Sequence, residues 1–278
     1  MNISKNKNLR KPIVEGIFYP SDKEELNNLI DSYIQNKVKG YSNLIISPHA
    51  GYAVTGQQMA DAFLSAAASD IKEVVIISSV HREEQEKIIL PGSSGFQTAA
   101  GELSINMKSL HLFKGDDPSI IRDEIPHLEE HAIEDQLPFI SKILGDVQIL
   151  PILLGKTTIT MVKKLTKALE RAYSSSPQNI LFVITSNLSL YEEENAALDK
   201  ADKALKAFKR GDWREICELK RTWQIDACGA GGLAAVLALY DKSFNMDVIS
   251  RSKSEGKESE KGKIVSYGAI TFSGRNNA

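Results

Sequence analysis

The sequence predicts an α/β fold with a mainly parallel central sheet flanked by helices. Four short apolar runs are rich in β-branched residues, as strands buried on both faces of a parallel sheet are. They occupy residues 44–46, 74–77, 149–154 and 180–184. Amphipathic segments separate these runs, and such an alternation of strands and helices is typical of a parallel sheet covered by helices.

The helical segments are expected at residues 21–35, 57–67, 159–173 and 192–209, with shorter ones at 213–219 and 233–239. Ser21 and Glu24 form a capping-box signature at the start of the first segment.

Two regions depart from the alternating order. Residues 87–105 are predicted to form a hairpin around Gly92 to Gly95, and the end of the chain reads as strand 247–251, a charged surface loop 253–263 and strand 264–272. Since no linker or internal repeat is present, we expect one domain over residues 1–278.

Composition argues against several classes of protein. The chain carries 34 basic and 36 acidic residues, a net charge of −2, so neither nucleic acid nor a membrane surface is expected as a partner. No apolar run approaches the roughly 18 residues that span a bilayer, and the N-terminus lacks the apolar segment of a signal peptide. The two cysteines cannot form a disulfide framework, which predicts a cytoplasmic, reducing location.

Two of the five histidines directly follow predicted strands. His49 comes after the run at 44–46, and His81 comes after the run at 74–77. In open α/β sheets, ligands bind at the edge formed by the carboxyl ends of the strands. A single loop histidine is more often hydrogen-bonded locally, but two at matching strand ends indicate a shared site.

Cys228 lies in a Gly-rich turn before the helical pattern at 233–239. A thiol at a helix N-terminus is stabilised as the thiolate, the form that binds metals, because unpaired amides and the helix dipole favour negative charge. A small buried thiol packed at the turn is the alternative, and local sequence does not choose between the two. Cys217 lies inside the pattern at 213–219, where a core thiol is expected.

The segment HLEEH at residues 127–131 matches the H-x-x-E-H pattern of inverted zinc proteases. Histidines four residues apart share one helix face, so both would reach one metal. Prolines on either side leave room for only a short helix, and a solvated acidic helix start explains the segment as well. A zinc hydrolase with His127, Glu130 and His131 is therefore the minor alternative. We expect His127 and His131 not to bind zinc as a pair, and His131 to be the one that faces the pocket.

Several separated segments form an ordered set of motifs. They are GIFYP at 16–20, PHAGY at 48–52 with a glycine at 56, VH at 80–81, EHAIE at 130–134 followed by LP, ILPILLG at 149–155, CG at 228–229 and SYGA at 266–269. In content and order, this set resembles the Memo family, whose PHAGYxxxG signature is quite specific. The resemblance covers nearly the whole chain.

The resemblance implies the fold of class III extradiol ring-cleaving dioxygenases, which hold non-haem Fe(II) with two histidines and a glutamate. In Memo-like proteins a cysteine replaces the glutamate, and this set maps onto His49, His81 and Cys228 here. It implies a mononuclear iron or copper ion and redox chemistry, and the donor types also admit zinc.

The same motifs indicate the surrounding pocket. His131 and Glu134 come from EHAIE, Tyr52 comes from PHAGY, and Asn187 and Leu190 come from the segment TSNLSL. The family has aspartate and histidine at the last two positions. Since Asn187 cannot ionise and Leu190 cannot exchange a proton, this wall is expected to be more neutral and apolar than in the family. Two further family histidines are replaced, by an arginine at 82 and a glutamine at 136.

Three functions follow as hypotheses. The first is a metal-dependent redox protein or oxygenase acting on a small molecule, and the second is a non-catalytic binding or adaptor protein that keeps the pocket for a small molecule or peptide. The third is the zinc hydrolase. Because Cys228 is a soft, oxidisable ligand in place of a hard carboxylate, we expect no appreciable extradiol ring cleavage.

Overall fold

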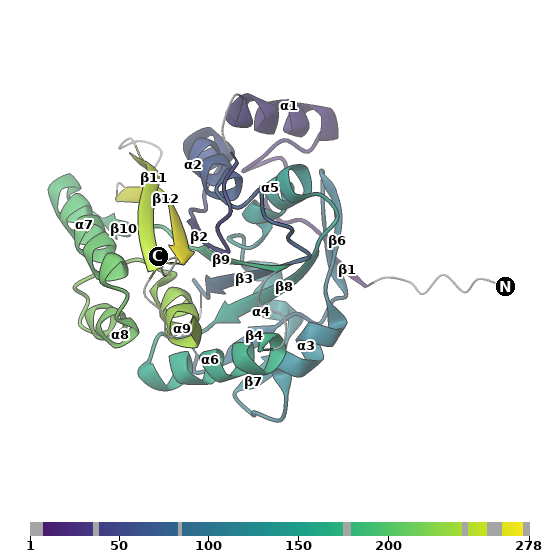
Figure 1. Ribbon diagram of the computed structural model, residues 1–278. Coiled ribbons are helices and arrows are strands. Elements are labelled where there is room, and N and C mark those ends of the chain that lie inside the picture. Colours follow the sequence, from purple (N-terminus) through teal and green to yellow (C-terminus); the bar gives the residue numbers. More distant parts are fainter. Residues whose placement is uncertain are drawn as a thin grey trace.

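A large mixed sheet runs through the centre of the computed structural model, with helices on both of its faces (Figure 1). The structure describes residues 8–35, 39–82, 85–174, 179–240, 244–254 and 263–274. Within them, the nine strands of this sheet follow the order β10-β12-β2-β9-β3-β8-β4-β7, with β11 also paired to β12, and β1, β5 and β6 form a second, small sheet.

The strands are β1 (Leu9–Arg10), β2 (Leu44–Ser47), β3 (Glu73–Ser79), β4 (Ile88–Leu90), β5 (Gly95–Thr98), β6 (Gly101–Ser104), β7 (Ile120–Arg122), β8 (Gln148–Leu154), β9 (Ile180–Thr185), β10 (Ser189–Tyr191), β11 (Phe244–Lys253) and β12 (Ile264–Gly274). The helices are α1 (Lys23–Ile34), α2 (Tyr52–Leu64), α3 (Met107–Lys114), α4 (Glu124–Glu129), η1 (Glu134–Gln136), α5 (Leu137–Phe139), η2 (Ile140–Leu144), α6 (Ile159–Tyr173), α7 (Glu194–Arg210), α8 (Trp213–Arg221) and α9 (Ala230–Tyr240).

The four predicted core strands are confirmed as β2, β9, β3 and β8, which pair in parallel in that order. Their side chains are almost entirely buried, as expected of strands with helices on both faces. The sheet is nevertheless mixed, because β12 pairs antiparallel with β2 and β4 pairs antiparallel with β8. The α/β class and a mostly parallel sheet are therefore confirmed, with antiparallel strands added at both sides.

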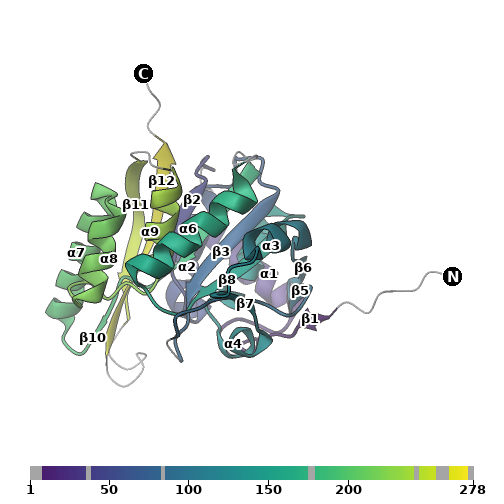
Figure 2. The ribbon, with the colours of Figure 1, turned by 90° about the horizontal axis from the view of Figure 1, so that it is seen from below.

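Helices cover both faces of the central strands. On one face α2 packs against β2 and β12, with α1 outside it. On the other face α9 lies against β3 and β9, and α6 and α3 continue this layer (Figures 1 and 2). The residues of α9 from 230 to 237 are all buried, so the helix that follows Cys228 is anchored in the core.

Two predicted helix starts are corrected by the structure. The cap of α1 is Asp22 rather than Ser21, because the Asp22 side chain accepts the main-chain N–H groups of Glu24 and Glu25 at 2.9 Å. Helix α2 begins at Tyr52, five residues before the predicted start. The PHAGY motif therefore leads from the end of β2 straight into a helix.

The predicted hairpin at residues 87–105 is also corrected. Strand β4 joins the large sheet, whereas β5 and β6 form the hairpin with its turn at residues 99–100 rather than 92–95. At the other end of the chain, β11 and β12 are longer than predicted, and the surface loop placed at 253–263 falls mainly on 255–262, outside the described residues.

Two smaller expectations can be compared with the structure. Cys217 is buried in α8 as a core thiol, and burial raises its pKa to about 11. In the part of the chain that the structure describes, no helix has the length and apolar character needed to cross a membrane.

Candidate metal centre

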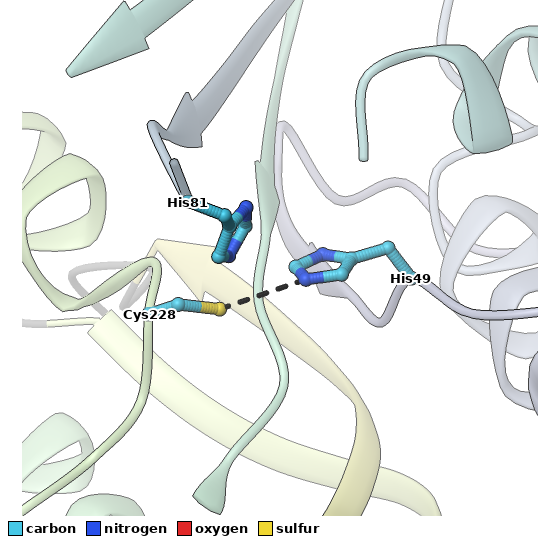
Figure 3. A group of neighbouring side chains, drawn as sticks. All are labelled: His49, His81 and Cys228. Carbon is cyan, nitrogen blue, oxygen red and sulfur yellow. Dashed lines mark hydrogen bonds between the residues drawn. The ribbon is translucent and has the colours of Figure 1, made fainter. Parts of the chain in front are cut away.

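Three side chains from distant parts of the chain meet at the carboxyl edge of the parallel strands. His49 follows β2, His81 follows β3, and Cys228 lies two residues before α9. One ligand atom from each lies within 4.8 Å of the others (Figure 3). The predicted convergence of His49, His81 and Cys228 is confirmed, and its cause is the parallel register that brings the ends of β2 and β3 to the same edge.

The His49 imidazole has a contact at each of its two ring nitrogens. Its Nδ1 lies 2.7 Å from Oγ1 of Thr185, the last residue of β9, which is paired with the last residue of β2. Its Nε2 faces the Sγ of Cys228 at 3.8 Å. His49 is 4% exposed, so its ring orientation is set by these neighbours rather than by solvent.

The His81 imidazole is held by a buried carboxylate. Oε2 of Glu130 lies 2.9 Å from Nδ1 of His81 and accepts the main-chain N–H of His81 at 3.2 Å, while Oε1 accepts the N–H of Ala132 at 3.0 Å. Burial opposes the charge of Glu130, but the hydrogen bond and charge of His81 outweigh it and lower the pKa of Glu130 to about 2. Burial also lowers the pKa of His81, but the hydrogen bonds of His81 to Cys228 and Glu130 outweigh burial and raise this pKa to about 10.

Cys228 is surrounded by hydrogen-bond donors. Its Sγ accepts the main-chain N–H of Asn187 at 3.3 Å, and its carbonyl oxygen accepts the Ser79 hydroxyl at 2.6 Å. Burial raises the pKa of the thiol, but the positive charge and hydrogen bonding of His49 and His81 dominate and hold the pKa well below its usual value. These interactions favour the thiolate form of Cys228, one of the two interpretations that its sequence left open, and the two histidines are the main cause.

Gly229 allows Cys228 to approach the sheet closely. A Cβ at this position would lie 2.6 Å from the Cβ of Ser186 and 2.7 Å from a methyl group of Ile184. The Gly229 N–H donates to the Ser186 hydroxyl at 2.9 Å. A side chain here would push the 228–229 turn, and with it the sulfur, away from the end of β9.

His131 is a third imidazole beside the site. Its ring centre lies 5.6 Å from that of His49 and 6.1 Å from that of His81, and its edge meets Phe18. Burial and the neighbouring His49 charge lower the pKa of His131 to about 4, so its ring is neutral at neutral pH. Its side chain is 31% exposed, which leaves it accessible to a ligand.

His127 lies away from His131 and the other two histidines of the site, which agrees with the expectation that His131 alone lies beside the pocket. Helix α4 ends at Glu129, so His127 and His131 do not share a helix face. His127 is buried, with Nε2 3.2 Å from the carbonyl oxygen of Ile89, and burial lowers its pKa to about 3. Among the described residues, no metal-sized group of ligands contains His127.

Two residues expected in the pocket belong to the core instead. Glu134 is fully buried and paired with Arg10, and it also accepts the Tyr19 hydroxyl at 2.8 Å and the Val14 N–H at 3.0 Å. Tyr52 is 1% exposed, and its hydroxyl donates to the carbonyl oxygen of Asp135 at 2.7 Å. Both motif residues fasten the segment that carries Glu130 and His131 rather than facing a ligand.

The other two expected pocket residues differ from each other. Asn187 contacts His49 and Cys228 directly. Leu190 is 44% exposed on the short strand β10 and pairs with Val265 of β12. Of the two replaced family histidines, Gln136 donates to the carbonyl oxygen of Pro48 at 3.0 Å, and Arg82 is exposed.

Several groups that hold the three site residues in place were not predicted from the sequence. Thr185 ends a buried strand at the same edge as Ser47, so it was visible as a polar strand-end residue. Ser79, at the end of β3, gave the same signal. Arg10 gave none, because its bonds to the carbonyl oxygens of His127 and Glu130 span more than a hundred residues.

Comparison with known proteins agrees with the motifs. The model of the Memo-like protein family matches residues 10–271. A MEMO1 family protein of Thermotoga petrophila is 29% identical over 95% of this chain and 99% of its own length. One of Thermotoga neapolitana is 30% identical over 83% of this chain and 88% of its own, and one of Nitrosopumilus maritimus is 25% identical over 95% and 99%. The chain therefore belongs to the Memo-like protein family.

Proposed function

We propose that His49, His81 and Cys228 bind one redox-active metal ion, iron or copper, and that the protein is a metal-dependent redox protein or oxygenase acting on a small molecule. The observation that supports this is the approach of three donor atoms to within 4.8 Å of one another. Without a ligand, this arrangement would leave the Cys228 sulfur and two imidazoles facing one another.

The ligand set fits such an ion. Nδ1 of His49 is engaged by Thr185 and Nδ1 of His81 by Glu130, so each ring keeps Nε2 for the metal. Metal-bound histidines usually anchor their second nitrogen in this way. A thiolate with two imidazoles suits copper, iron or zinc. When bound, a redox-active ion would supply electron transfer and Lewis-acid polarisation.

The protein's own groups would control orientation. Glu130 holds the His81 ring, and Thr185 holds the His49 ring. His131 is neutral, partly exposed and close to both rings, so its ring nitrogens would be available to hydrogen-bond with a ligand in the site. Asn187, beside Cys228, adds no ionisable group to the site.

We further propose that the fold is that of the class III extradiol dioxygenases. The support is the mostly parallel sheet, in which two of the proposed ligands follow β2 and β3, the parallel strands on either side of β9. A cavity of about 260 Å³ has walls that include Val80, Arg82 and Glu130, but none of the three proposed metal ligands lines it. Its volume is slightly below the range of about 300–1,000 Å³ typical of small-molecule pockets.

Metal analysis of matched variants tests the proposal. The purified protein, incubated with Fe(II) or Cu(I) under anaerobic conditions and then desalted, should retain about one equivalent of metal. His49→Ala, His81→Ala and Cys228→Ser should each lose most of it, whereas His111→Ala, on the exposed side of α3, should retain it. Zinc lost in His127→Gln but kept in His49→Ala would favour the hydrolase and contradict this proposal.

A further inference from the structure

Asn187 contacts two members of the proposed metal centre at once. Its side-chain Oδ1 accepts the main-chain N–H of His49 at 3.2 Å, and its Nδ2 donates to the carbonyl oxygen of His49 at 3.2 Å. Its own main-chain N–H donates to Sγ of Cys228 at 3.3 Å. One residue thus holds the backbone of His49 and the sulfur of Cys228.

The two-way contact with His49 requires an amide. An asparagine side chain offers both an acceptor and a donor, whereas an ionised aspartate offers only acceptors. An aspartate here would keep the bond from the His49 N–H but would turn an oxygen towards the His49 carbonyl oxygen. It would lose one bond, set two acceptors against each other, and add a negative charge near the Cys228 thiolate.

The contact also decides where the His49 ring points. Thr185 holds Nδ1 at 2.7 Å from the side of β9, and Asn187 fixes the peptide groups on both sides of the His49 Cα atom. With both ends held, Nε2 is left facing Sγ of Cys228 at 3.8 Å. We propose that Asn187 is a positioning residue that fixes where His49 lies relative to Cys228. It does so through the two side-chain hydrogen bonds to the main chain of His49, which we call the amide clasp. Its effect on metal binding rests on the proposed function.

The added negative charge and the lost hydrogen bond predict opposite effects of Asn187→Asp on metal affinity. If Asn187 acted only through its neutrality, the added negative charge would attract a metal cation and tighten binding. If it acts through the clasp, the variant loses a bond to His49, the ring shifts, and binding weakens. Groups that orient metal ligands typically contribute about 10–100-fold to affinity. We therefore expect Asn187→Asp and Asn187→Ala both to bind metal about tenfold or more weakly.

Cobalt(II) is a suitable probe, because a thiolate ligand gives it a strong near-ultraviolet charge-transfer band. Titration of the wild-type protein should produce this band with one equivalent, and both Asn187 variants should require higher Co(II) concentrations and show a shifted band. Asn28→Asp, the same change on an exposed face of α1, serves as the control and should behave as wild type. Tighter or unchanged binding by Asn187→Asp would overturn the clasp.

Hydrogen exchange in the metal-free protein tests the clasp separately from the metal. The His49 amide should be protected in the wild type and should exchange about tenfold or more faster in Asn187→Ala, because its acceptor is removed. Absence of the charge-transfer band in the wild type would contradict the metal centre, and the exchange rates would then decide the clasp alone. Unchanged His49 exchange in Asn187→Ala would refute the clasp whatever the metal does.

Discussion

Glu130 accepts two contacts from His81 at one oxygen, from ring Nδ1 at 2.9 Å and from the main-chain N–H at 3.2 Å. The carboxylate is buried, while the imidazole it holds is about one-third exposed. Of the two histidines proposed as ligands, the more exposed one therefore has the stronger electrostatic anchor.

Replacement of Glu130 by glutamine should weaken metal binding. The amide keeps the shape of the side chain but removes the negative charge that holds the His81 ring. We expect affinity for Co(II) to fall by about 10–100-fold, measured by competition with a chelating dye. Glu129→Gln changes an exposed neighbour in the same way and should leave the affinity unaltered. Equal affinities in the two variants would show that Glu130 does not orient His81.

Stability should depend on pH through His127. Burial lowers its pKa to about 3, below the value of about 6.5 expected in the unfolded chain. The unfolded state therefore binds the proton more readily, and the stability that neutral His127 contributes is present above about pH 6.5 and is lost as the pH falls towards 3. Urea unfolding should show a free energy that falls with a slope of up to about 1.4 kcal/mol per pH unit from this group between pH 6 and pH 5.

The variant His127→Gln should reduce this slope, because glutamine can still donate to the carbonyl oxygen of Ile89 but does not titrate. His131, whose pKa is also lowered, contributes in the same direction and remains in the variant. His111→Gln, on exposed α3, is the control and should keep the wild-type slope. A His127→Gln slope equal to that of wild type would contradict the prediction.

Replacement of Trp223 by glycine should stabilise the protein. Trp223 has φ 57° and follows α8, where its N–H donates to the carbonyl oxygen of Lys220 and that of Gln224 donates to Leu219. This is a helix-ending turn that usually has glycine at the left-handed position. The tryptophan is 70% exposed, so little packing is lost, and relief of about 1 kcal/mol of backbone strain is expected.

The reciprocal change provides the comparison. Gly211 ends α7 with φ 72°, and Gly211→Ala should destabilise the protein by a similar amount. Thermal unfolding measures both, with shifts of about 2–4 °C in opposite directions. If Trp223→Gly lowered the midpoint instead, the indole would have to contribute packing that outweighs the strain.

Extradiol ring cleavage should be absent. Protein loaded anaerobically with Fe(II), mixed with a panel of catechols and then exposed to oxygen, should form no yellow ring-opened product. Cys228 offers a soft sulfur donor rather than a hard carboxylate, and the Asn187 amide is committed to His49 and cannot ionise. Turnover that disappears in His49→Ala would refute this expectation. The double variant Asn187→Asp with Leu190→His, compared at the same bound Fe(II) content to allow for its weaker metal binding, tests whether these two departures are the reason.

The strands and the three proposed ligands were predictable because their signals are local. A buried parallel strand reads as a continuous apolar run, and the residue after it lies at the sheet edge, so His49 and His81 could be placed without a structure. Cys228 was less certain from the residues alone, since a buried thiol in a Gly-rich turn gives the same pattern. Its place beside the histidines followed only from the resemblance to the family.

The errors share one cause, which is that a motif does not show which way its side chains point. Tyr52 and Glu134 stand beside His49 and His131 in the sequence, yet both turn into the core, where Asp135 and Arg10 bind them. Arg10 reaches Glu134 across 124 residues, and no local pattern predicts such a pair. From the sequence, Asn187 was interpreted only as the loss of an acidic residue. In the structure its side-chain amide both accepts a hydrogen bond from the main chain of His49 and donates one to it.

The separation of the three ligands along the chain has a consequence for biosynthesis. Cys228 lies 179 residues after His49. At a synthesis rate of about 5–20 residues per second, roughly 10–35 s pass between them. During that interval the growing chain contains His49, and later His81, but not yet Cys228. Under the proposed function, the complete metal site therefore forms only after Cys228 has been synthesised, and the ion bound reflects the metals available to the protein after that point.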